Sequence, residues 1–104
     1  ILMHKVIKDG KVAVLVSHGY GAGWSSWAHD TDCLFDPDIV QLVLDGASTE
    51  TILQCAHEKW PDDYWGGVGG LTVHWIPEGT QFRIDEYDGA ETIEYNSDVR
   101  WIIA

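Results

Sequence analysis

Residues 12–27 read VAVLVSHGYGAGWSSW, and the interpretation of the rest of the chain depends on them. The stretch begins as a continuous apolar run, which is typical of a strand buried on both faces in the middle of a sheet. It then breaks into the alternating glycines Gly19, Gly21 and Gly23 and closes with two tryptophans. A buried strand that leads into a glycine-aromatic loop is a common way to build a binding site, and also a common way to turn a corner.

The composition predicts a single folded domain over residues 1–104. Hydrophobic residues make up 45% of the chain, which argues against a disordered protein. The formal net charge is −11 and there are only six Lys and Arg residues, which argues against direct binding to nucleic acid or to an anionic membrane. The same acidity favours a partner protein with a basic face.

The two cysteines, Cys33 and Cys55, form neither a CxxC motif nor a disulfide framework. We therefore expect free thiols and a reducing compartment, the cytoplasm. No apolar run is as long as a membrane span, and the first residues lack the layout of a signal peptide. Ile1 and Leu2 precede Met3, which we expect to be the natural start.

Two short helices are predicted in the middle of the chain. Asp36 followed by Pro37 is an N-cap with proline at the first helical position, and Gly46 ends that helix. A second helix begins at Ser48 or Thr49 and stops before the next proline.

Strand patterns surround these helices. Asp-Gly at residues 9–10 predicts a tight turn between an edge strand and the inner strand, with Ile7 opposite Val12. Further strands are expected at 71–76, 80–87 and 99–103. We therefore predict an α+β fold: an antiparallel sheet of about five strands with two short helices packed on one face.

Asp-Gly at residues 88–89 predicts a second two-residue hairpin, and its register can be counted outward from the turn. The count pairs hydrophobic side chains on the core face and places Glu86 opposite Glu91. These carboxylates could form an acid/base pair or a cation site, but a solvated acidic edge is the favoured interpretation because charges at a hairpin tip repel only weakly in water. One shared core is expected for Trp75, Phe82, Ile84, Ile93, Tyr95 and Trp101.

Enzyme motifs are incomplete. Ser17, His18 and the glycines after them are similar to the oxyanion loop of α/β-hydrolases, but the chain has no G-x-S-x-G elbow. The glycine spacing also misses the dinucleotide fingerprint, because Trp24 stands where the third glycine belongs. The histidines and cysteines lack zinc-type spacing. We expect no catalytic residue, no metal and no cofactor.

Aromatic residues flank two glycine loops, at 18–27 and 64–70. We predict that the loops lie side by side at one end of the sheet, with Trp24 within about 10 Å of Trp65 around an open cleft. The alternative is that these aromatics cover the protein's own core. The candidate ligand- or partner-binding residues are His18, Tyr20, Gly21, Gly23, Trp24, Ser25, Trp27, Tyr64, Trp65, Gly66 and Gly67.

Nearly the whole chain from residue 10 onward resembles a family of small acidic proteins of unknown function from tailed bacteriophages and some bacteria. The stretches that carry the resemblance are GKVAVLVS (10–17), GYGAGWSSW (19–27), LFDPDIV (34–40), Trp65-Gly66-Gly67 with Gly69, and WIPEGTQFRIDEYDGAETIEY (75–95). The resemblance implies an accessory protein that acts in the cytoplasm of a bacterial host. Small proteins of this kind often bind and block a host factor or sequester a small molecule.

Two functions therefore stay open. The first is a non-enzymatic protein that binds and inhibits a host factor with a basic face through its acidic surface. The second is a module that holds a nucleotide-like or other small molecule between the two glycine-aromatic loops. Neither requires direct contact with nucleic acid or a membrane, and both are compatible with a homo-oligomer.

Overall fold

The computed structural model describes residues 5–19, 23–25, 31–65 and 67–95, and their elements are those of an α+β protein. The α+β prediction is confirmed. In chain order the elements are β1 (Ile7–Lys8), β2 (Lys11–Ser17), the 3-10 turn η1 (Asp32–Leu34), α1 (Pro37–Leu44), α2 (Thr49–Lys59), the 3-10 turn η2 (Val68–Gly70), β3 (Leu71–Pro77), β4 (Phe82–Tyr87) and β5 (Ala90–Tyr95).

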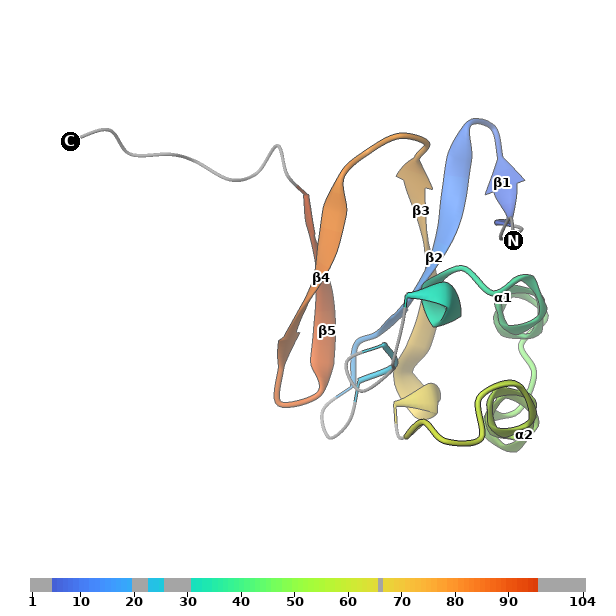
Figure 1. Ribbon diagram of the computed structural model, residues 1–104. Coiled ribbons are helices and arrows are strands. Elements are labelled where there is room, and N and C mark those ends of the chain that lie inside the picture. The colour runs from blue at the N-terminus through green and yellow to red at the C-terminus, as the bar shows by residue number, and fades with distance from the viewer. Residues whose placement is uncertain (1–4, 20–22, 26–30, 66, 96–104) are drawn as a thin grey trace.

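The five strands divide between two sheets, so the expected single sheet is wrong. One sheet has the antiparallel order β1-β2-β3, and the other is the β4–β5 hairpin alone. Figure 1 shows the hairpin on one side of the β1-β2-β3 sheet and the two helices on the other. The three-stranded sheet is thus the middle layer, with helices on one face as predicted.

β2 is the centre of this arrangement. Its residues from Val12 to Ser17 are all buried, and it pairs with β1 on one edge and with β3 on the other. The β2–β3 ladder runs from Lys11 opposite Pro77 to Ser17 opposite Leu71. The continuous apolar run predicted a strand covered on both faces, and that prediction is confirmed.

Both helices begin where the sequence predicted. The Asp36 carboxylate accepts a hydrogen bond from the Ile39 N–H at 3.0 Å and so caps α1. The Ser48 hydroxyl accepts from the Thr51 N–H at 3.2 Å and caps α2. Gly46 follows α1 with a φ of 72°, a left-handed conformation that glycine adopts without strain.

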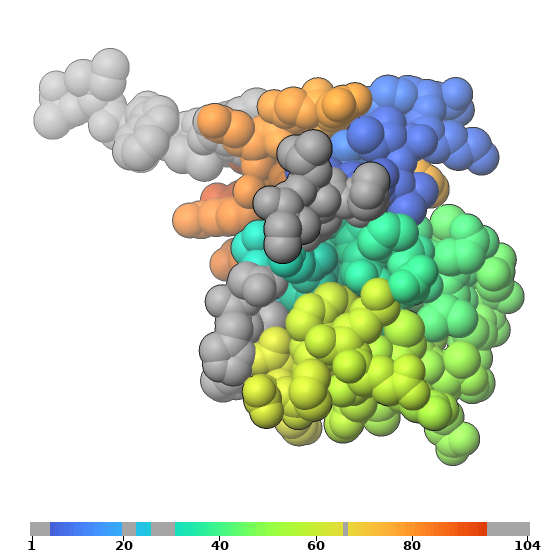
Figure 2. All heavy atoms as spheres, turned by 45° about the vertical axis from the view of Figure 1, so that its right-hand side comes forward, coloured from blue at the N-terminus to red at the C-terminus, as the bar shows by residue number. Residues whose placement is uncertain are grey.

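The helix side of the sheet holds the larger of two cores, and the helices cover it as a continuous mass (green and yellow-green in Figure 2). The hairpin side holds a second core, made of β2 and β3 side chains against Phe82, Ile84, Ile93 and Tyr95. Trp75 packs in the helix-side core, so the prediction that it shares a core with the hairpin is wrong. Alternate residues of β3 face opposite sides of the sheet, and Trp75 and Ile76 therefore separate.

The hairpin registers agree with the turn chemistry. Ile7 lies opposite Val12, and Ile84 lies opposite Ile93. The predicted strand at 99–103 lies outside the described residues. In the part of the chain that the structure describes, no helix combines the length and the apolar character needed to cross a membrane.

Candidate functional site

The two glycine loops meet at the end of β2, as predicted. The His18 N–H donates to the Gly70 carbonyl at 3.2 Å, and the Ser17 hydroxyl donates to the Gly67 carbonyl at 2.7 Å. A Cβ on Gly70 would lie 2.8 Å from the backbone nitrogen of Gly19, closer than real Cβ atoms come. Gly70 is therefore required for the two backbones to touch.

Trp24 and Trp65, from the two loops, belong to a cluster inside the helix-side core. The Trp24 and Trp65 ring centroids lie 4.4 Å apart, and Trp60 packs against both at 6.3 and 5.1 Å. The predicted approach of Trp24 to Trp65 is confirmed. Trp24 and Trp65 are only 0% and 3% exposed, however, so their rings do not wall an open cleft.

Hydrogen bonds of the indole nitrogens explain how these large side chains can be buried. Trp24 donates its Nε1–H to the Cys33 carbonyl at 2.8 Å, and Trp65 donates to the Trp60 carbonyl at 3.1 Å. Each ring therefore contributes its apolar area to the core while its polar atom keeps a partner. The described loop tryptophans cover the core, which was the alternative interpretation of the pattern.

Glu91 is the least expected residue of this region, because its side chain is fully buried. Its Oε1 accepts a hydrogen bond from the Ser17 N–H at 2.9 Å, and its Oε2 accepts from the Ser25 N–H at 3.0 Å and from the Ser25 hydroxyl at 3.4 Å. The prediction of a solvated acidic edge is therefore wrong for Glu91. Glu86, which lies opposite on β4, is exposed.

The position of Glu91 follows from the backbone of β2. The Ala13 N–H donates to the Val6 carbonyl at 2.9 Å on the β1 side of the strand. Ser17 points its N–H toward the same edge, because alternate residues of an antiparallel strand do so. At Ser17 the acceptor on that edge is the Glu91 carboxylate.

This carboxylate joins three parts of the chain: the end of β2, the loop after it and β5. A buried charge is costly unless charge-assisted hydrogen bonds compensate it, and backbone N–H donors provide such bonds here. The bonds of Glu91 to Ser17 and Ser25 fit a structural clamp better than an acid/base catalyst.

His18 and His74 form the second polar feature at this end of the sheet. Their Nε2 atoms lie 2.7 Å apart, and their ring centroids are 4.9 Å apart at an interplanar angle of 57°. His18 is exposed and His74 is partly buried. Burial, and after it the neighbouring His18, lower the pKa of His74 below its ordinary value.

Sequence reasoning found His18 but missed His74. The two residues are 56 positions apart, so no spacing motif links them. The available signal was the pairing of β2 with β3. In that register the even-numbered residues of β3, His74 among them, face the same side of the sheet as the even-numbered residues of β2, and His18 continues that series.

The other candidate residues are distributed unevenly. Gly23 and Gly67 are buried, Ser25 is partly buried, and Tyr64 is 63% exposed. The remaining four lie outside the described residues: Tyr20, Gly21, Trp27 and Gly66. That these residues contact a ligand or partner stays a prediction.

The cysteines and acidic groups show no metal centre within the described residues. There, no three His, Cys, Asp or Glu side chains gather closely enough to hold a metal ion by themselves. Cys33 and Cys55 are both free thiols, as predicted, and burial raises the pKa of the Cys55 thiol.

Comparison of the chain with protein-family models, with curated proteins and with solved structures found no match. The resemblance to small phage proteins therefore stays a prediction. The function has to be argued from the geometry and charge of this chain alone.

Proposed function

We propose that the protein is a non-enzymatic binding protein that contacts a partner with a basic face through the acidic β4–β5 hairpin. The observation that carries the proposal is the separation of charge over the molecule. The net charge of −11 is not spread evenly, because the basic side chains of the described residues are either gathered at the first hairpin or ion-paired.

Three lysines, at positions 5, 8 and 11, belong to the β1–β2 hairpin or directly precede it. Lys59 is held by two carboxylates, with its Nζ 3.2 Å from Asp36 and 2.7 Å from Asp38. Arg83 donates to both carboxylate oxygens of Glu94 at 2.9 Å. Of these groups only Arg83 lies on the β4–β5 hairpin, where it also interacts with Asp85. The acidic residues at the turn end of the hairpin outnumber it.

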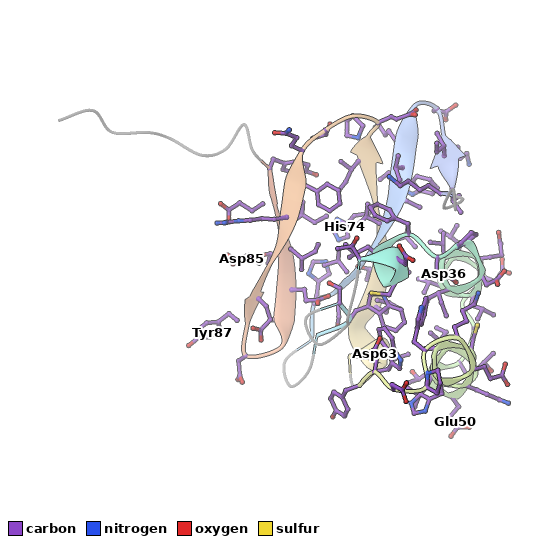
Figure 3. The ribbon with its side chains drawn as sticks, viewed as in Figure 1. Asp36, Glu50, Asp63, His74, Asp85 and Tyr87 are labelled. Atoms are coloured by element: carbon purple, nitrogen blue, oxygen red, sulfur yellow. The ribbon has the colours of Figure 1, made fainter. Side chains whose placement is uncertain are left out.

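That turn end presents Asp85, Glu86, Tyr87 and Asp88, all of them exposed. Figure 3 shows Asp85 and Tyr87 projecting away from the rest of the molecule. Tyr87 is 80% exposed, an unusual amount for a large aromatic side chain. Tyrosine is enriched at protein interfaces because its rigid ring supplies contact area and its hydroxyl a hydrogen bond.

The small-molecule alternative receives less support. It depended on Trp24 and Trp65 as the walls of a cleft, and both rings are buried. Glu91 likewise has both oxygens bonded to neighbouring protein groups.

The resemblance to phage proteins adds a context to this proposal. The partner would be a bacterial host factor, and binding would inhibit it. An acidic surface suits such a role, because complementary charge raises the association rate and favours basic partners over others.

The experiment is an affinity capture from bacterial lysate with three tagged baits. The wild-type protein should retain a basic protein that Asp85→Lys/Asp88→Lys loses and that high salt releases. Glu50→Lys/Glu58→Lys is the matched control, because it changes the net charge equally on exposed positions of α2, away from the hairpin (Figure 3).

Retention by the control together with loss by the hairpin variant would support the proposal. Equal capture by all three baits would contradict it. Equal loss by both variants would show that only net charge matters, which would overturn the assignment to the hairpin. Tyr87→Ala should weaken capture without changing the charge.

A further inference from the structure

The His18–His74 pair carries a chemistry that the protein-binding proposal does not use. Two imidazole nitrogens, one from the residue that follows β2 and one from β3, converge to 2.7 Å next to solvent. In this hydrogen bond one Nε2 carries the hydrogen and the other directs its lone pair at it. If that hydrogen moves to Nδ1 of the same ring, both Nε2 lone pairs become available. An imidazole lone pair is also the donor that transition metals accept.

We propose that His18 and His74 form a two-histidine site for a divalent cation of the copper or nickel type. The separation of the two nitrogens is compatible with this class. A metal with bonds of about 2.0 Å that meets two nitrogens at a right angle holds them about 2.8 Å apart, close to the 2.7 Å seen here.

A tetrahedral metal such as zinc needs two ligand nitrogens that lie farther apart. With the same bond length its ligand nitrogens lie about 3.3 Å apart, so the two strands or side chains would have to separate. Copper and nickel accept square-planar or tetragonal arrangements of nitrogen and oxygen, in which neighbouring ligands stand at right angles.

The charge of the protein favours the binding of a cation. The protein carries a net charge of −11, which raises the concentration of cations near its surface. No third potential ligand gathers with the pair among the described residues, so water completes the coordination. A bound metal would join the start of the glycine loop to the middle of β3.

The test is titration of the purified protein with Cu²⁺, Ni²⁺ and Zn²⁺ at neutral pH, followed by calorimetry. The wild type should bind one equivalent, with Cu²⁺ tighter than Ni²⁺ or Zn²⁺. His18→Ala and His74→Gln should each weaken binding by roughly tenfold or more, since even outer-shell changes commonly cost that much.

Matched controls use the other histidines. The triple variant His4→Ala/His29→Ala/His57→Ala keeps the pair and should bind Cu²⁺ as the wild type does. Electron paramagnetic resonance of the Cu²⁺ complex should show two imidazole nitrogens in this triple variant and one in each single variant. That readout reports the ligands directly and does not depend on stability.

Wild-type Cu²⁺ affinity in either His18→Ala or His74→Gln would overturn the proposal. So would loss of binding in the triple variant, because the pair alone would then be insufficient. Circular dichroism checks that His74→Gln is folded, and His18 is exposed, so its replacement leaves the core intact.

Discussion

The two hairpins of this protein share one turn and differ in how they are held. Asp9-Gly10 and Asp88-Gly89 both adopt positive φ at both positions, at 54° and 76° in the first turn and 51° and 85° in the second. This is the pattern of the type I′ turn that two-residue hairpins favour. One hairpin nevertheless extends into a larger sheet, while the other forms a sheet of its own.

The difference lies in the strands and not in the turns. β2 is apolar on both faces, so it can be covered by helices on one side and by a hairpin on the other. β4 and β5 alternate apolar and polar residues, so they bury one face only. The first hairpin is held by a backbone ladder to β3, and the second by side chains and the Glu91 carboxylate.

The largest effect is expected when the second hairpin loses its buried carboxylate. Glu91→Ala leaves the N–H groups of Ser17 and Ser25 without this acceptor, which should lower the free energy of unfolding by about 3–5 kcal/mol. Urea denaturation measures the loss, and hydrogen exchange should show the Ser17 amide deprotected. A change below about 0.5 kcal/mol would contradict the clamp.

The apolar contacts of the central sheet and of the second hairpin should differ in strength. Ile76 on β3 is 2% exposed, so Ile76→Ala should cost about 2–5 kcal/mol. Ile84 on β4 is only partly buried, and Ile84→Ala should cost about 1–2 kcal/mol. Equal losses in urea denaturation would show that the second hairpin packs as tightly as the central sheet.

Alanine in either turn tests the feature that the hairpins share. Gly10→Ala and Gly89→Ala place a Cβ in the left-handed region, which should cost about 1–2 kcal/mol each. A Cβ on Gly10 has no atom within 4 Å, so its cost is conformational alone. Gly69→Ala is the control, because that site is equally open and has no positive φ. If Gly10→Ala and Gly69→Ala lowered the melting temperature equally, the expected strain of alanine in the left-handed conformation would be contradicted.

The smallest loss of stability is expected from a substitution of Glu86, which lies opposite Glu91 on the neighbouring strand. Glu86 is exposed and accepts a hydrogen bond from the Gly89 N–H. Glu86→Ala should cost about 0.5–1 kcal/mol, the net value of one such bond. If Glu86→Ala and Glu91→Ala destabilised the protein equally, the contrast between the two carboxylates would be wrong.

Local chemistry made much of the fold predictable. A two-residue turn permits one register, and a capping carboxylate or hydroxyl next to an apolar run marks a helix start. Accordingly Ile84 opposite Ile93 and the caps at Asp36 and Ser48 are confirmed. Each of these features depends on residues close to one another in the chain.

The candidate site was less predictable, although one clue was present. Glu86 and Glu91 fall on the same hairpin face as Ile84 and Ile93, so the register already turned them toward the core side. It could not show that Glu91 would be buried while Glu86 stayed exposed. That depends on the backbone N–H of Ser17, which is 74 residues away.

The sequence by itself determined the elements, their turns and caps, and the strongly acidic character of the protein. Only the tertiary structure decided that five strands form two sheets, that the loop tryptophans Trp24 and Trp65 enter the core, and that His18 meets His74. The physical reason is the distance along the chain over which each interaction acts. Turns, caps and alternation act between near neighbours, whereas burial and the pairing of polar groups depend on which distant surfaces the packed layers bring together.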